Sequence, residues 1–130
     1  MTRNHLLDAS GLLALLFNEP GAESILDLLD DCAIHAVNLA EAVRKLADAG
    51  ASAGEAAAEI DALNLEVIDE FGAAQAYEIA RLAPEAKRLG LSLGDCVCLI
   101  TAEWRGLTAL TADRSWKKLR GRKVKIVLIR

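Results

Sequence analysis

Four acidic residues are placed where they could act together. Asp8 and Asp113 each come at or just after the end of a short apolar run, and Glu41 and Asp95 each lie near the expected start of a helix. Carboxylates that share one neighbourhood repel each other, and a hard divalent cation with oxygen ligands removes that repulsion. The chemistry to look for is therefore an all-oxygen site for Mg²⁺ or Mn²⁺.

Each of these acids also has a purely structural interpretation. Glu41 lies three residues after Asn38, and Asp95 lies three residues after Ser92; both spacings fit a capping box at the start of a helix. The other two acids could cap helices themselves. The surroundings of Asp95 favour a functional role, because its sequence neighbours are apolar and no Lys or Arg lies close to it in the sequence. A buried carboxylate is costly unless it is paired or bound to a metal.

The elements that must position these acids are short apolar runs alternating with helical patterns. The predicted strands span residues 4–7, 33–37, 65–68, 107–111 and 124–129. The predicted helices span residues 10–18, 23–31, 38–49, 55–63, 71–82 and 93–105, the fifth ending before Pro84. Such alternation is typical of a parallel sheet covered on both faces. We predict a single α/β domain over residues 1–130, with three α/β/α layers and five strands.

The acids are expected to meet at one edge of this sheet. In an open parallel sheet, ligands bind beyond the carboxyl ends of the strands, where Asp8 and Asp113 should lie. The returning helices begin at the same edge, so Glu41 and Asp95, taken to lie in first helical turns, belong there too. Two nearby hydroxyls could orient these acids or add oxygen contacts: Ser10 and Thr111.

Composition favours a folded cytoplasmic protein. The chain has 130 residues, of which 53% are hydrophobic, and its longest unbroken apolar stretch, residues 12–17, is far shorter than a membrane span. The first residues do not resemble a secretory signal. The three cysteines, Cys32, Cys96 and Cys98, are predicted to be buried free thiols in a reducing compartment.

The charge is distributed unevenly. Residues 114–130 contain eight basic and no acidic residues, whereas residues 1–113 carry seven bases against nineteen acids, a net charge of −12. The basic end is either a solvated surface or a patch that meets phosphates or an acidic partner. On the second interpretation, the RNA-contact candidates are Arg114, Lys117 and Lys118.

Four segments occur in an order that resembles the PIN-domain family. They are LLDASGLLALL, AVNLAEAVRKL, LGLSLGDCVCLITA and LTALTADRSWKKL. The resemblance covers essentially the whole chain and is most specific over residues 89–116. Within the family the chain looks most like the VapC ribonuclease toxins of type II toxin–antitoxin pairs. The resemblance implies a three-layer fold with strand order 3-2-1-4-5.

The resemblance also implies an activity, a metal and partners. It implies an endoribonuclease that hydrolyses RNA phosphodiester bonds with Mg²⁺ or Mn²⁺ held by Asp8, Asp95 and Asp113. Glu41 would ligate metal or polarise the attacking water, and Ser10 would support the acids together with Thr111. It further implies a VapB-like antitoxin and a homodimer. Some residues of the apolar stretch 12–17 could serve either interface.

One departure and several alternatives stay open. Some relatives carry a further acid shortly after the fourth, where this chain has Ser115 and Trp116, so one and two metal ions are both compatible with it. Trp116 is expected to pack, with stacking on an RNA base as the alternative. The main functional alternative is a non-catalytic PIN-like binding module that acts through protein–protein contacts. A phosphoacceptor receiver-type domain would need Asp69 as acceptor and a Lys after the last strand. A dinucleotide-binding domain would need a Gly-rich turn after the first strand, where this chain has Asp-Ala-Ser-Gly. His5 and His35 are expected to be core or edge residues.

Overall fold

A five-stranded parallel sheet forms the centre of the computed structural model, which describes residues 3–130. Its strands, in order across the sheet, are β3 (Glu66–Ile68), β2 (Cys32–His35), β1 (His5–Leu7), β4 (Thr108–Thr111) and β5 (Lys125–Leu128). All neighbouring pairs run parallel. The predicted order 3-2-1-4-5 is confirmed, and β1 lies directly beside β4.

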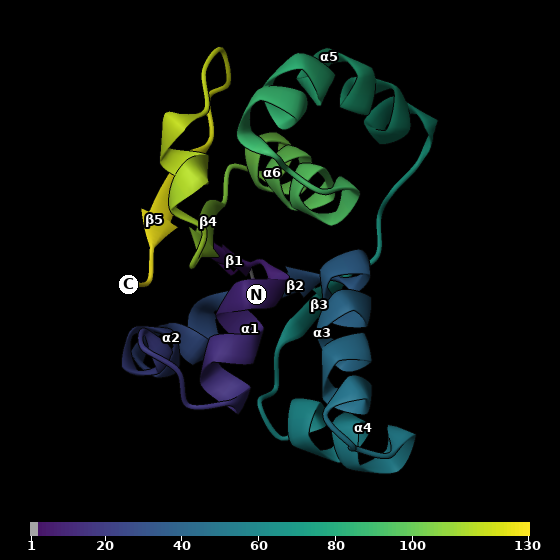
Figure 1. Ribbon diagram of the computed structural model, residues 1–130, viewed down its shortest axis with the longest axis vertical. Helices are drawn as coiled ribbons and strands as arrows, with labels where there is room; N and C mark the ends of the chain where they lie inside the picture. The colour runs from purple at the N-terminus through teal and green to yellow at the C-terminus, as the bar shows by residue number, and fades with distance from the viewer. Residues whose placement is uncertain (1–2) are drawn as a thin grey trace.

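Helices cover both faces of this sheet, as Figure 1 shows. One face carries α5 (Ala73–Leu89) and α6 (Leu93–Arg105). The other carries α1 (Ala9–Leu16), α2 (Ala22–Leu28) and α3 (Ala36–Asp48), and α4 (Ala53–Asp61) packs against α3. Two short 3₁₀ turns, η1 (Leu29–Asp31) and η2 (Arg114–Lys118), precede β2 and β5. The three predicted layers are confirmed. Among residues 3–130, no helix is both long and apolar enough to cross a bilayer.

Consecutive residues of the central strand β1 are apolar, with no alternation of apolar and polar side chains, because both faces of the strand are buried. Leu6 packs into the core shared with α5 and α6, while Leu7 packs into the core on the α1 side. Successive side chains of a strand point to opposite faces, and both faces are covered here. The polar residue that follows, Asp8, therefore marks the end of the buried strand.

The prediction that Pro84 ends a helix is wrong, because α5 continues through it to Leu89. A proline inside a helix removes one hydrogen bond to the carbonyl four residues earlier. That carbonyl belongs to Ala80, which is exposed like Pro84, so water can satisfy it. Buried Leu82 and the packed Ala86 hold the helix on both sides of the proline.

The start of α3 also differs from the prediction. His35, not Asn38, is the N-cap, and its Nδ1 accepts a hydrogen bond from the backbone N–H of Val37 at 3.0 Å. The helix therefore begins at Ala36, and Asn38 lies inside it. The capping box predicted for Asn38 and Glu41 does not form. Histidine is a less common cap than Asn, which is why the sequence pattern favoured the wrong residue.

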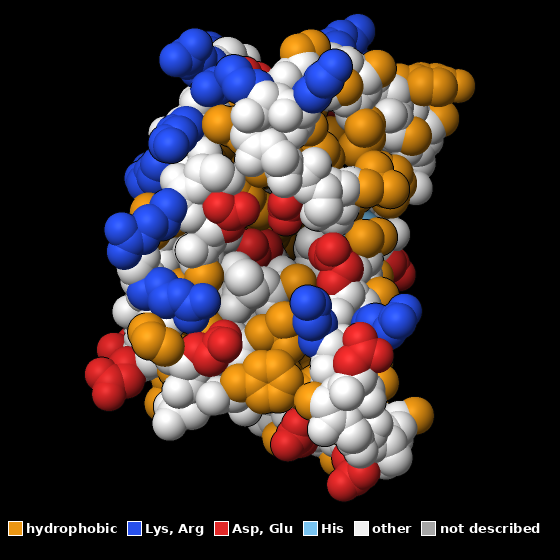
Figure 2. All heavy atoms as spheres, in the orientation of Figure 1, with side chains coloured by type: hydrophobic (Ala, Val, Ile, Leu, Met, Phe, Trp, Pro, Cys, Tyr) orange, Lys and Arg blue, Asp and Glu red, His pale blue; other side chains and the backbone are white. Residues whose placement is uncertain are grey.

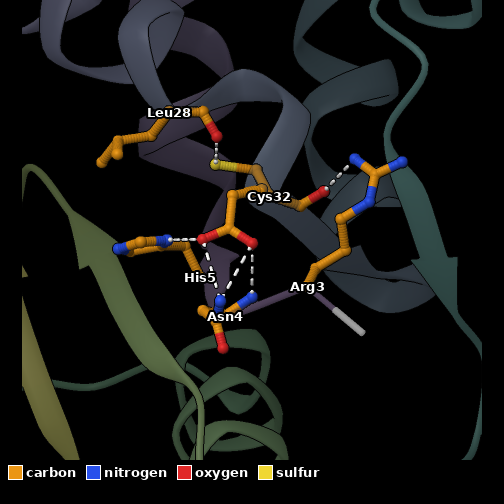
Figure 3. Close-up of polar contacts among 6 residues, drawn as sticks. Arg3, Asn4, His5, Leu28 and Cys32 are labelled. Carbon is orange, nitrogen blue, oxygen red and sulfur yellow. Dashed lines mark hydrogen bonds and ion pairs between the residues drawn. The ribbon is translucent and has the colours of Figure 1, made fainter. Parts of the chain in front are cut away.

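Polar contacts fix β1 at the amino edge of the sheet, shown in Figure 3. The carboxylate of Asp31 accepts hydrogen bonds from the backbone and side chain of Asn4 and lies 3.0 Å from His5 Nδ1. Arg3 donates to the carbonyl of Cys32 at 3.1 Å. These contacts tie β1 to the start of β2. They thereby set where Asp8 emerges at the opposite edge.

Candidate active site

The four predicted acids come from four separate elements at the carboxyl edge of the sheet. Asp8 directly follows β1 and caps α1, whereas Asp113 lies two residues after β4 and caps η2. Asp95 lies in the first turn of α6, as predicted. Glu41 lies in the second turn of α3 rather than the first, because the helix starts earlier than expected. Figure 2 shows acidic side chains gathered around a hollow between α6 and the helices α1 and α3.

Asp8 is the fixed, buried member of this group. Its Oδ1 accepts hydrogen bonds from Ser10 Oγ at 2.7 Å and the Gly11 N–H at 2.8 Å, and its Oδ2 accepts from Thr111 Oγ1 at 2.6 Å. Burial raises the pKa of Asp8 to about 6, although these three hydrogen bonds lower it and the charge of Asp95 raises it further. A carboxyl group that is costly to ionise is thus held in one orientation.

The two hydroxyls connect the ends of β1 and β4. Ser10 Oγ accepts a hydrogen bond from the backbone N–H of Ala112 at 2.9 Å. Thr111 Oγ1 accepts one from the backbone N–H of Asp113 at 3.0 Å while it donates to Asp8. Both residues predicted to support the acids therefore touch Asp8, and Thr111 also links it to Asp113.

Asp95 and Asp113 each use one carboxylate oxygen in a helix cap. Asp95 Oδ2 accepts from the Ser92 N–H at 2.9 Å, which completes the predicted capping box. Asp113 Oδ1 accepts from the Ser115 N–H at 2.9 Å. Burial raises the pKa of Asp95; its hydrogen bonds with Ser92 lower it and the charge of Asp113 raises it. Asp95 and Asp113 therefore cap helices and also repel each other electrostatically.

The donor set of this hollow fits a hard divalent cation. None of the ion pairs within residues 3–130 involves Asp8, Glu41, Asp95 or Asp113, so no Lys or Arg neutralises the cluster. Across the described chain, Asp95 Oδ1, Asp113 Oδ2 and Glu41 Oε2 receive no hydrogen bond. Carboxylate oxygens of this kind are the ligands that Mg²⁺ and Mn²⁺ prefer.

The acids do not yet converge on one point. Within the described residues, no three His, Cys, Asp or Glu side chains already form a metal-binding group. Asp8 is held by three donors, whereas Glu41, Asp95 and Asp113 keep free oxygens. Metal binding would therefore require rotation of the less restrained Asp95 and Asp113 side chains toward Asp8.

The basic end of the chain is divided between structure and surface. Arg122 forms ion pairs with Glu78 at 2.6 Å and Glu103 at 2.8 Å, which joins the segment before β5 to α5 and α6. Lys117 Nζ donates to the Ile126 carbonyl at 2.6 Å. Among the described residues, the side chains of Arg114 and Lys118 have no such partner, and both are exposed. Figure 2 shows Lys and Arg side chains along the rim of the same face, over η2 and β5.

Several other predicted residues have structural positions. His35 is buried at the end of β2 and its Nε2 lies 3.1 Å from the Glu70 carbonyl, while His5 is half-buried beside Asp31. Trp116 is fully buried, so it packs and cannot stack on RNA in this conformation. Asp69 is exposed beyond β3. The sheet order also differs from the 2-1-3-4-5 order of receiver domains, which excludes that alternative.

Sequence reasoning missed two residues at this site, Asn38 and Gly94. Asn38 Nδ2 donates to Glu41 Oε1 at 3.0 Å and to the Gly94 carbonyl at 2.9 Å, and so links α3 to α6. The hydrogen bond to Gly94 joins residues 56 positions apart, so no local sequence pattern predicts it. The spacing of Asn38 and Glu41 was a real signal, but it was interpreted as a cap.

Comparison with known protein families gives one match over most of the chain. The PIN domain family matches residues 5–122, which includes all four acids. A comparison with curated proteins returned no match.

Solved structures share the fold at low sequence identity. A chain of VapBC2 from Rickettsia felis, bound to a promoter DNA fragment, superposes with a TM-score of 0.74 at 20% identity, covering 95% of this chain and 97% of that one. DNA-bound VapBC from Salmonella typhimurium gives a TM-score of 0.74 at 20% identity, covering 100% of both chains. VapBC-1 from nontypeable Haemophilus influenzae gives 0.71 at 16% identity, covering 96% and 97%. Likeness at this level of identity establishes the fold.

Proposed function

The chain belongs to the PIN domain family, and on that premise we propose that it is a metal-dependent endoribonuclease, the toxin of a VapBC-type toxin–antitoxin pair. PIN domains are generally nucleases. One observation carries the proposal: carboxylates from four separate elements surround one hollow, and no ion pair to Lys or Arg among residues 3–130 neutralises them. Helix capping does not account for the whole set, because Glu41 lies in the second turn of α3 and caps no helix.

In this proposal each residue has a defined task. Asp8, Asp95 and Asp113 would hold Mg²⁺ or Mn²⁺. Once bound, such a cation makes water more acidic and offsets negative charge on the phosphate. Glu41, on the opposite helix, would accept the proton of the attacking water. Ser10 and Thr111 fix the orientation of Asp8 through the hydrogen bonds described above.

The structural neighbours supply the proposed protein partner. Each of the three structures described above is a VapBC system, which motivates a VapB-like antitoxin for this chain. The net charge of −12 over residues 1–113 suits a basic inhibitory segment lying across the hollow. We also propose a homodimer, with the apolar residues 12–17 as its candidate surface; Phe17, directly after α1, is exposed.

The direct test is cleavage of RNA by purified protein. We expect endonucleolytic products with Mg²⁺ or Mn²⁺, none with EDTA, and loss of cleavage in Asp95→Asn. Asp27→Asn is the matched control, because Asp27 is an exposed acid on α2 away from the hollow. Cleavage that survives in purified Asp95→Asn and in EDTA would mean a contaminating nuclease or a different site. If wild-type protein neither cleaves RNA nor is stabilised by metal, the binding-module alternative is favoured.

The exposed cations next to the hollow give a second prediction. Neutralising Arg114 or Lys118 with Gln should raise KM for RNA, since each is expected to contact a phosphate, with little change in kcat. Each variant should also reduce the dependence of log affinity on log salt concentration by about one. Lys87→Gln, on the exposed side of α5, is the control and should change neither quantity. An unchanged salt dependence in Arg114→Gln, measured by RNA binding to the inactive Asp95→Asn background, would remove this residue from the substrate path.

A further inference from the structure

Asn38 occupies an unusual position beside the acidic hollow. Its side chain is fully buried, and its amide nitrogen donates to Glu41 Oε1 on the same helix and to the Gly94 carbonyl on α6. Residues three apart on a helix share a face, so Asn38 and Glu41 lie side by side. An amide nitrogen has two N–H groups, and here each has one acceptor. Asn38 therefore ties the Glu41 carboxylate to the start of α6.

The oxygen of the Asn38 amide shows that the orientation of this side chain is constrained. Asn38 Oδ1 is buried and has no hydrogen-bond partner among the described residues. Turning the amide over would place this oxygen against two acceptors and would leave both without a donor. Buried polar atoms are almost always paired, so an unpaired one calls for an explanation. The explanation that fits these contacts is that one donated hydrogen bond holds Glu41 while the other ties Asn38 to α6.

Gly94 restrains Glu41 from the opposite side. A Cβ atom added at Gly94 would come closer to all three carboxylate atoms of Glu41 than the 3.0 Å that real Cβ atoms keep. Gly94 is not among the glycines with positive φ, so the backbone itself does not require glycine there. The missing side chain is instead the space that the Glu41 carboxylate occupies. That carboxylate ends a flexible side chain, so an added methyl group would displace it and leave the helix in place.

We propose that Asn38 and Gly94 together form a clamp that positions Glu41 for the hydrolytic step. The proposal rests on the nuclease function proposed above. Neither residue reaches the substrate: Asn38 supplies the hydrogen bond and Gly94 supplies the space. Both are positioning residues that act through Glu41, and the clamp joins the two helices that border the hollow.

The sharpest test compares two Gly→Ala variants. Gly94 in α6 and Gly54 in α4 are each the second helical residue after a serine N-cap with a capping box. A Cβ at Gly54 would meet only Ser52 Oγ, at 4.0 Å. Gly54→Ala should keep wild-type cleavage. Gly94→Ala should keep the melting temperature measured without metal, but lower kcat by roughly 10- to 100-fold with KM nearly unchanged. A crystal structure of Gly94→Ala should show the Glu41 carboxylate displaced from α6.

A double-mutant cycle separates positioning from general damage. Asn38→Ala should lower kcat to a similar degree as Gly94→Ala. In a Glu41→Gln background neither change should lower the residual rate further, because the group they position is already gone. Losses that multiply in that background would overturn the clamp. If Asn38→Ala does not fold, the same cycle with Gly94→Ala decides.

Wild-type protein measured in parallel separates the two proposals. If wild type does not cleave RNA with Mg²⁺ or Mn²⁺, the nuclease function fails and the clamp fails with it. If wild type cleaves and Gly94→Ala cleaves at the same rate with Glu41 unmoved, the clamp alone is overturned.

Discussion

Asp8→Asn is expected to abolish RNA cleavage and, at pH 8 without metal, to make the folded protein more stable than wild type. The activity loss, by a factor on the order of 10³, follows from removing one of the carboxylates proposed to hold the metal. The gain in stability follows from burial. The pKa of Asp8 is raised from 3.8 to about 6 because its carboxyl group is buried, so ionising it at neutral pH destabilises the fold.

The sign and the pH window follow from that pKa. Between about pH 4 and 6, folded protein holds a proton on Asp8 that the unfolded chain has already released. The free energy of unfolding therefore falls as pH rises through this window, by on the order of 3 kcal/mol in total. Asn does not titrate and loses one of three hydrogen bonds, which costs about 1 kcal/mol. The net gain of about 1–2 kcal/mol at pH 8 corresponds to a rise in Tm of roughly 3–6 °C.

Thermal melting in EDTA at pH 4 and pH 8 measures this effect. The advantage of Asp8→Asn should appear at pH 8 and disappear or reverse at pH 4. Asp27→Asn, an exposed acid, should show no comparable change. A lower Tm for Asp8→Asn at pH 8 would show that the hydrogen bonds from Ser10, Gly11 and Thr111 stabilise the carboxylate more than burial destabilises it.

Most of the fold was predictable because its signals are local. Strands buried on both faces read as short apolar runs, and α6 matched its predicted bounds, residues 93–105, because Ser92 and Gly106 mark both ends. Predictions were wrong where tertiary contacts override a local rule. Pro84 is tolerated because Ala80, whose carbonyl loses its helical partner, is an exposed residue, and because packed residues flank the proline. His35 caps α3 in place of Asn38, which is instead drawn into a contact with α6.

The gathering of the four acids at one edge of the sheet was more predictable than the geometry of their side chains. Parallel topology alone brings Asp8, Glu41, Asp95 and Asp113 to one edge, because strand ends and helix starts meet there. Their sequence neighbours revealed the supporting hydroxyls of Ser10 and Thr111, since those contacts are partly local. The restraint of Glu41 by Asn38 and Gly94 was not predictable from one sequence. This restraint depends on how closely α3 and α6 approach each other, and no local sequence pattern predicts that distance.

The second large effect is stabilisation by metal, which should depend strongly on pH. At pH 8 the negative charges of neighbouring acids make each carboxyl group harder to ionise. The charge of Asp95 raises the pKa of Asp8, and the charge of Asp113 raises the pKa of Asp95. A bound cation offsets this repulsion, and at a concentration 100 times its Kd it adds about 2.7 kcal/mol, or roughly 5–10 °C in Tm.

Below about pH 6 a proton on Asp8 competes with the cation, so apparent affinity should fall by up to about tenfold per pH unit and the rise in Tm should shrink. Melting with and without Mn²⁺ at pH 5, 6.5 and 8 tests this. Asp95→Asn should lose the rise and Asp27→Asn should keep it. A rise that is equal at pH 5 and pH 8, or that survives in Asp95→Asn, would place the cation elsewhere on the surface. The carboxylates around the hollow would then be helix caps that happen to be neighbours.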